Sequence, residues 1–249
     1  MECVDSVVIL FTIFYYLAVK IPIMGVSFDL WKTLIGSNPD FSAERDLYLS
    51  KQLGIPALDI SKALRASDKR CDGVSDVTGR HFGPAERLNS ALEELGYVTA
   101  DCDVDQWVVG IQKIFLKHPI RLKEPDLLAT LDKLKQHAKL AVTSNTGFID
   151  GICMRKALDR AGILSRMDAV IFSNEIHAAK PDGRIFQHTI SLLGMPPENI
   201  VHIGDRLKAD YNGARSVGMQ AVWLVEQDRT GEVITAPTIQ IAYERGYLT

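Results

Sequence analysis

The sequence has few of the features that mark secreted, nucleic-acid-binding or disordered proteins. It contains four cysteines in 249 residues, and none of them forms a C-x-x-C pair. These cysteines (Cys3, Cys71, Cys102 and Cys153) are therefore expected to be reduced thiols, not a disulfide framework or a zinc site. No block of Lys or Arg occurs and the net charge is −3, which argues against a nucleic-acid partner and leaves a small ligand as the expectation.

A long hydrophobic run occurs only at the N-terminus, where residues 7–19 read VVILFTIFYYLAV. This run is short for a membrane-spanning helix, and the acidic residues Glu2 and Asp5 do not suit a signal peptide. We therefore predict that residues 1–23 are an extension outside the folding unit, in a cytoplasmic protein with no clear membrane partner. Membrane association through residues 7–19 is the alternative.

From Met24 onward the hydrophobic pattern becomes regular. Short apolar runs of strand length occupy residues 25–29, 140–144, 169–173, 200–204 and 220–225. Amphipathic stretches of helical period lie between the later runs, at residues 125–137, 148–162, 184–194 and 207–218. This alternation predicts an α/β fold with a parallel, Rossmann-like sheet between two layers of helices. Ligands bind such sheets beyond the carboxyl ends of the strands, and the tail after Val225 is a candidate edge strand.

Residues 36–122 break the alternation, because they contain helical patterns without a convincing strand. The predicted helices cover residues 42–54, 57–70, 84–96 and 103–118, and a glycine-rich segment at 71–83 is expected to interrupt them. We predict a helical cap over residues 36–122 and a core built from residues 24–35 and 123–249. Since the insert leaves the core after the first strand, it should stand over the carboxyl edge of the sheet.

Polar residues gather where the predicted strands end. They are Asp29 after the first strand, Ser144 and Asn145 after the second, Asp205 and Asp210 near the fourth, and Lys180 in a loop before a helix. Carboxylates that converge on one edge repel each other unless a cation lies among them. Because the candidate ligands are hard oxygen atoms, the sequence predicts a Mg²⁺ site. A carboxylate nucleophile, a lysine and hydroxyl or amide donors beside Mg²⁺ suit phosphoryl transfer.

Four motifs in a fixed order carry a resemblance to a known family. They are FDLWKT at 28–33, VTSN at 142–145, AAKPD at 178–182 and GDRLKAD at 204–210. Each motif alone is common, but the set in this order resembles the haloacid dehalogenase (HAD) superfamily over residues 24–225. The helical insert matches that family's cap between the first and second motifs.

The resemblance implies a role for each motif residue. Asp29 would be the nucleophile, Ser144 would bind the transferring group, and Lys180 would neutralise charge. Asn145 and Trp31 would contact the substrate. Magnesium would be held by Asp29, Asp205, Asp210 and the backbone carbonyl of Trp31. The implied activity is a Mg²⁺-dependent phosphatase that acts on a small phosphorylated metabolite through an aspartyl-phosphate.

Trp31 departs from the family pattern, because phosphatases of the family usually carry a second Asp two residues after the nucleophile. An indole N–H cannot act as an acid or base at neutral pH. Three interpretations stay open: a phosphatase with an activated leaving group or another proton source, a 2-haloacid dehalogenase, or a catalytically weak binding or regulatory protein. The dehalogenases carry an aromatic residue at this position, but they lack the acidic metal motif that is present here.

The sequence leaves the substrate and the oligomeric state open. The cap offers the cations Arg45, Arg65, Arg70, Arg80, His81, Arg87 and Lys113, but charges on a cap helix usually face solvent. Lys32 is expected to face solvent as well. Trp31 could serve as an apolar wall of the pocket or as packing beneath the cap, since tryptophan is used for both.

Overall fold

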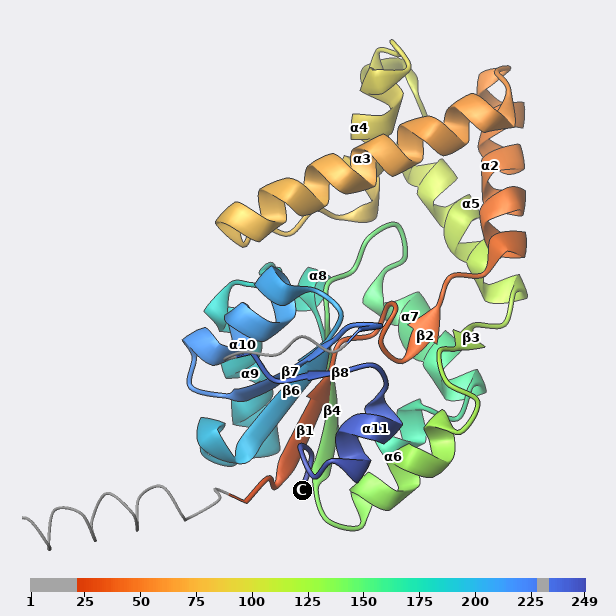
Figure 1. The fold of residues 1–249 in the computed structure, drawn as a ribbon. Helices are drawn as coiled ribbons and strands as arrows, with labels where there is room; N and C mark the ends of the chain where they lie inside the picture. Colours follow the sequence, from red (N-terminus) through yellow and green to blue (C-terminus); the bar gives the residue numbers. More distant parts are fainter. Residues whose placement is uncertain (1–21, 228–232) are drawn as a thin grey trace, which may run out of the picture.

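The computed structural model describes residues 22–227 and 233–249 (Figure 1). The predictions for residues 1–21, including the membrane alternative at 7–19, lie outside these residues. Within the described part, none of the helices has the length and hydropathy needed to cross a membrane.

The core contains a sheet of parallel strands in the order β5-β4-β1-β6-β7-β8. The strands are β1 (Gly25–Phe28), β4 (Lys139–Ser144), β5 (Ala169–Phe172), β6 (Ile200–Gly204), β7 (Gln220–Leu224) and β8 (Thr235–Ala236). All five pairings between neighbours are parallel. The five predicted strands are therefore present, and the C-terminal tail adds β8 at the edge as expected.

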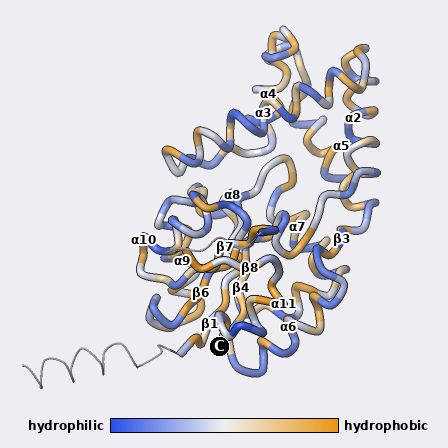
Figure 2. Tube along the Cα trace, in the orientation of Figure 1, coloured by the Kyte–Doolittle hydropathy of each residue, from blue (hydrophilic) through white to orange (hydrophobic). Residues whose placement is uncertain are grey.

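Two layers of helices cover the sheet because its strands are apolar on both faces. The helices of the core are α6 (Leu127–Lys135), α7 (Gly151–Arg160), α8 (Ser173–Ile176), α9 (Gly183–Leu193), α10 (Gly213–Ser216) and α11 (Ile239–Glu244). Helices α6, α7 and α11 lie on one side of the sheet, and α9 and α10 lie on the other (Figure 1). Every residue of β1 and β6 is buried, and hydrophobic positions concentrate along these strands (Figure 2). The predicted three-layer α/β fold is thus confirmed.

The first four α-helices that follow β1 in the chain stand above the carboxyl edge of the sheet (Figure 1). They are α2 (Pro39–Leu53), α3 (Ala57–Thr78), α4 (Pro84–Glu94) and α5 (Val104–Lys117), with the short turn η1 (Thr99–Asp101) before α5. Asn38 caps α2 by accepting the N–H of Asp40, and Pro39 starts the helix where no intrahelical N–H partner is needed.

The glycine-rich segment at 71–83 interrupts the helices as expected, but only at residues 79–83, because α3 continues through the first part of the segment to Thr78. One side of this part of the helix is buried, at Cys71 and Ser75, and this packing outweighs the low helix propensity of Gly73. The helix ends at Gly79, whose φ of 69° lies in the left-handed region. A Cβ there would also overlap the side chain of Asp182 in the core, so Gly79 allows a close approach between helix and core.

The segment that carries α2 to α5 leaves and rejoins the core at one place. Strand β2 (Ile35–Gly36) pairs antiparallel with β3 (Arg121–Leu122), and the Asn38 amide donates to the carbonyl of Pro119 at 2.9 Å. This arrangement supports the proposal that residues 36–122 form a cap, with residues 24–35 and 123–249 as the core.

Candidate active site

Asp29 lies one residue beyond β1, at the edge of the sheet that faces the cap helices. Its backbone N–H donates to the carbonyl of Ile203 on β6 at 2.8 Å, so the neighbouring strand fixes its position. Asp210 comes close from the π-helical turn η4 (Leu207–Asn212), which follows β6. A Cβ on Gly204 would overlap the Asp210 carboxyl group, and a glycine at the end of β6 is therefore required for this approach.

Lys180 joins two of the predicted carboxylates. Its Nζ lies 2.6 Å from Asp29 Oδ1 and 2.7 Å from Asp210 Oδ1. The lysine side chain is 2% exposed, and those of Asp29 and Asp210 are 11% and 1% exposed. A buried ammonium group shared by two carboxylates satisfies charges that would be costly to bury alone.

The pKa values of this group reflect a balance between burial and charge. Burial raises the pKa of Asp29 to about 7, although Lys180 opposes the shift. Burial also acts to raise the pKa of Asp210, but Lys180 and His202 outweigh it and the pKa is lowered. The pKa of Lys180 is raised, because Asp210 and Asp29 outweigh the effect of burial. Asp210 thus carries the charge that pairs with Lys180, whereas the charge on Asp29 is only partly compensated.

Asn145 holds the main chain of Lys180. Its Oδ1 accepts the N–H of Lys180 at 2.7 Å, and its Nδ2 donates to the Lys180 carbonyl at 3.0 Å. Ser144 is the last residue of β4, and its buried hydroxyl donates to the carbonyl of Asn145 at 3.2 Å. Asn145 lines the cavity described below, but its amide group is engaged with Lys180, so its contact with substrate stays a prediction.

Asp205 completes a group of acidic side chains that could hold a metal ion. One carboxylate oxygen each from Asp29, Asp205 and Asp210 lies within 4.8 Å of the others. Burial, followed by the charge of Asp210, raises the pKa of Asp205. The three carboxylates lie around one buried ammonium group, which pairs with only two of them. The site therefore has excess negative charge and only oxygen ligands, and these properties fit Mg²⁺. The contribution of the Trp31 carbonyl stays a prediction.

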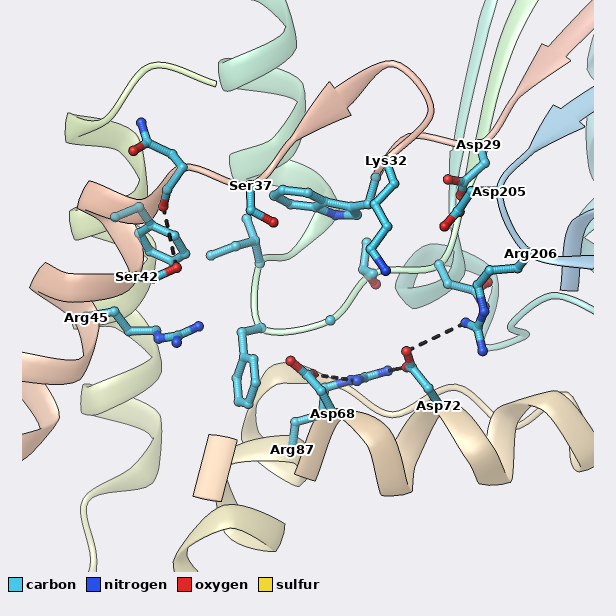
Figure 3. Close-up of a pocket in the computed structure, with 18 residues that line it drawn as sticks. Asp29, Lys32, Ser37, Ser42, Arg45, Asp68, Asp72, Arg87, Asp205 and Arg206 are labelled. Carbon is cyan, nitrogen blue, oxygen red and sulfur yellow. Dashed lines mark hydrogen bonds and ion pairs between the residues drawn. The ribbon is translucent and has the colours of Figure 1, made fainter. Parts of the chain in front are cut away.

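A cavity of about 370 Å³ opens between these residues and the cap helices, and its volume suits a small ligand. Asp29 and Asp205 line it from the core (Figure 3). Trp31 is half-buried and lines it as well, while its ring also packs at 57° against Phe115 of α5, with a centroid distance of 6.4 Å. The two alternatives for Trp31, pocket wall and packing beneath the cap, therefore both hold.

Comparison with known proteins assigns the family. The family model for haloacid dehalogenase-like hydrolases matches residues 23–218. The chain belongs to this family. The resemblance drawn from the four motifs is thus confirmed.

Known proteins with similar sequences or folds include phosphatases and dehalogenases. A phosphoserine phosphatase of Thermus thermophilus is 31% identical over 87 residues, which are 35% of this chain and 35% of that protein. A HAD phosphatase from Thermococcus onnurineus has a similar fold, with a TM-score of 0.61, 25% identity, and coverage of 90% of this chain and 98% of that one. A 2-haloacid dehalogenase from Pseudomonas syringae also has a similar fold, with a TM-score of 0.62 and 20% identity. The match covers 91% of this chain and 100% of that one.

The cap side of the cavity in this HAD-like hydrolase is highly charged, which the sequence did not reveal. Arg45 of α2, Asp68 and Asp72 of α3, and Arg87 of α4 line it together with the core residues Lys32 and Arg206. Arg45 and Arg87 were expected to face solvent, but the Arg45 side chain is 12% exposed and that of Arg87 is 4% exposed. Lys32 is exposed as expected, yet it also borders the cavity.

Most of these charges are paired with one another. Arg87 contacts Asp68 and Asp72 at 2.8 Å each, and Arg206 contacts Asp76 of α3 at 2.6 Å. A chain of ion pairs therefore links the cap helices α3 and α4 to the residue that follows Asp205 in the core (Figure 3). This chain holds the cap over the acidic group.

Proposed function

We propose that the protein is a Mg²⁺-dependent phosphatase that acts on a small phosphorylated metabolite. The observation that carries this proposal is the grouping of Asp29, Lys180, Asp205 and Asp210, of which Asp29 and Asp205 line a cavity beneath the cap. The phosphatases among the similar proteins support it. Because the match to the Thermus protein spans 35% of that protein, its substrate is not transferred to this chain.

In the proposed reaction Asp29 attacks the phosphorus atom of the substrate. The bond between phosphorus and the ester oxygen breaks, and an aspartyl-phosphate forms on Asp29. Water then attacks that phosphorus, releases phosphate and restores the carboxylate. Lys180 and the Ser144 hydroxyl would stabilise the negative charge on the transferring group.

Magnesium would be held by Asp29, Asp205 and Asp210, with the Trp31 carbonyl as a further ligand. When bound, it would supply charge neutralisation at the phosphoryl oxygens. It would also favour the ionised form of Asp29 that is needed for attack, since a nearby positive charge lowers the pKa of a carboxyl group.

Trp31 limits the substrates that this site can process. The residue occupies the position from which family phosphatases protonate the leaving oxygen, and the indole cannot donate that proton. A missing general acid typically lowers the rate by roughly 10²–10⁴-fold. We therefore expect acyl phosphates and aryl phosphates, whose leaving groups need little protonation, to be hydrolysed faster than alkyl phosphates.

The experiment measures phosphate release from p-nitrophenyl phosphate and acetyl phosphate by the purified protein. Hydrolysis should require Mg²⁺, stop in EDTA, and disappear in Asp29→Asn. Hydrolysis that continues in EDTA or survives Asp29→Asn would contradict the proposal.

The second candidate function is carbon–halogen hydrolysis, which is favoured by one observation. The aromatic ring of Trp31 borders the cavity, as an aromatic residue does at this position in the dehalogenases that the sequence resembles. Turnover of 2-chloropropionate in the presence of EDTA would support this candidate. Tight binding of a phosphorylated metabolite without turnover of either substrate class would instead support a regulatory protein.

A further inference from the structure

One end of the cavity is built to bind a group that is distant from Asp29. Figure 3 shows Ser37, Ser42 and Arg45 at one end, with Asp29 and Asp205 at the other. Phe41, Phe148 and Trp31 provide apolar surface in the same cavity. A ligand with its phosphate at Asp29 would therefore reach the cap residues with its opposite end.

Arg45 is held rigidly at that end. Its Nε and Nη2 contact the same oxygen, Oδ1 of Asp46, at 2.8 and 2.7 Å. Its guanidinium group also lies over two aromatic rings, 5.5 Å from the centroid of Phe41 and 5.8 Å from that of Phe148. These contacts fix the orientation of a side chain that otherwise has high rotamer freedom.

The free edge of the Arg45 guanidinium group decides what can bind there. Asp46 uses the Nε–Nη2 edge, whereas Nη1 has no hydrogen-bond partner among residues 22–227 and 233–249. The Nη1–Nη2 edge keeps N–H donors in the planar arrangement that matches a carboxylate with two parallel hydrogen bonds. Arg45 lines the cavity and its side chain is 12% exposed, so an acceptor on a ligand can reach the free Nη1–Nη2 edge and form charge-assisted hydrogen bonds there.

Neighbouring charges favour a carboxylate over a second phosphate. Asp46 already balances the positive charge of Arg45, and Arg87 is paired with Asp68 and Asp72. This end of the cavity therefore offers directed donors and little excess positive charge, which suits a group with one negative charge better than a dianion.

We propose that Arg45 binds the carboxylate of a phosphorylated carboxylic acid and thereby selects this substrate class. The inference rests on the proposed phosphatase function. Ser37 and Ser42 would add hydroxyl contacts, since within residues 22–227 and 233–249 the Ser42 hydroxyl makes one hydrogen bond, a long one of 3.4 Å to the carbonyl of Asn38. The volume of about 370 Å³ limits the acid to a small metabolite.

The test compares substrates that differ in this one group. Wild type should show a kcat/KM for 3-phosphoglycerate at least about tenfold above that for glycerol 3-phosphate, because a charge-assisted bidentate contact is lost in the alcohol. Arg45→Gln should remove most of this preference. Arg45→Lys keeps a cation beside Asp46 but lacks the free guanidinium edge, so it should lose a large part of the preference for the acid. This variant replaces Arg45→Gln in the test if Arg45→Gln does not fold.

Arg65→Gln is the matched control, because Arg65 is an exposed cap arginine whose Nη1 donates to Ser61. It should keep the wild-type ratio between the two substrates. Equal losses for acid and alcohol in Arg45→Gln, or no preference in wild type, would overturn the proposal. A preference for glycerol 1,3-bisphosphate over 3-phosphoglycerate would overturn the assignment to a carboxylate.

A binding measurement separates this inference from the proposed function. If wild type hydrolyses no phosphate ester, the function fails, and calorimetry with the same two compounds then tests the subsite alone. Tighter binding of 3-phosphoglycerate that is lost in Arg45→Gln would uphold the subsite. Equal binding of both compounds would refute it.

Discussion

At the scale of single residues, the charge balance around Lys180 decides both stability and chemistry. Lys180 is buried between Asp29 and Asp210, and its ammonium group is the direct ion-pair partner of both carboxylates. The pKa of Asp29, raised to about 7 chiefly by burial, shows that one lysine does not fully compensate the site. A divalent cation would complete the compensation.

Replacing Lys180 should therefore destabilise the fold strongly. In Lys180→Met two buried carboxylates lose their partner, and we expect the free energy of unfolding to fall by about 3–5 kcal/mol. Urea denaturation measures this loss, and Mg²⁺ should restore part of it. Lys135→Met is the control, because Lys135 pairs at the surface with Asp168 at 3.3 Å and such pairs contribute at most about 1 kcal/mol. Equal stability of Lys180→Met and wild type would contradict this reasoning.

Trp31 provides a second test at this scale. Trp31→Asp introduces the carboxyl group that the family phosphatases carry, so kcat/KM for an alkyl phosphate should rise relative to that for p-nitrophenyl phosphate, by about tenfold or more. Trp31→Phe removes the indole without adding an acid and is the matched control for lost packing against Phe115. If both variants change the ratio equally, Trp31 has a packing role alone.

At the scale of the elements, the cap meets the core where α3 ends. The carbonyl of Gly79 accepts the N–H of Ala179 at 2.9 Å, and His81 Nδ1 lies 3.0 Å from the hydroxyl of Ser173. Burial, together with the charge of Arg87, lowers the pKa of His81 to about 4, while Glu86 opposes this shift and His177 adds to it. The neutral imidazole is therefore the form that fits between cap and core.

This contact predicts a specific pH dependence of stability. The ordinary pKa of histidine is about 6.5, so between pH 6.5 and about 4 the unfolded chain binds a proton at His81 that the folded protein does not. Stability should therefore fall as the pH drops through this window. Thermal unfolding of wild type and His81→Asn should show a smaller loss in the variant, whereas the exposed His137→Asn should follow wild type. Parallel curves for His81→Asn and wild type would contradict the prediction.

The elements also show what the sequence could predict. Strands β1, β4, β5, β6 and β7 were found because they are buried on both faces and their apolar runs are continuous. The polar residues at their ends followed from the rule that parallel strands place their carboxyl ends on one edge. The two-residue strands β2 and β3 were missed, because two residues carry no periodic pattern.

The cap side of the cavity was beyond prediction for a different reason. Helical periodicity shows that α2 and α4 are amphipathic, but it does not show which partner a buried polar position faces. Arg87 is buried because Asp68 and Asp72 come from another helix, 19 and 15 residues away. Such pairings depend on the tertiary packing of the cap.

At the scale of the whole molecule, side-chain contacts join cap and core in addition to the polypeptide connections between them. One buried hydrophobic cluster includes Phe41 and Phe115 of the cap helices as well as Phe28 and Leu140 of the sheet. The Arg206–Asp76 ion pair adds a polar contact between core and cap, next to Asp205. The two parts therefore support each other, although the cap is inserted at a single place.

We expect the two parts to unfold in one cooperative transition. Trp107 on α5 reports on the cap and Trp223 on β7 reports on the core, so variants in which Trp31 and one of these two tryptophans are replaced by Phe give separate fluorescence probes. The midpoints of urea denaturation should coincide. Two separated midpoints would show that the cap folds and unfolds independently.

The covalent intermediate on Asp29 is the most direct test of the proposed chemistry. The protein is mixed with acetyl phosphate and Mg²⁺, quenched in acid during turnover, digested and examined by mass spectrometry. The account predicts one phosphoryl group on the peptide that contains Asp29, and none in EDTA or in Asp29→Asn. Phosphorylation of a different residue, or turnover without any phosphorylated peptide, would contradict it.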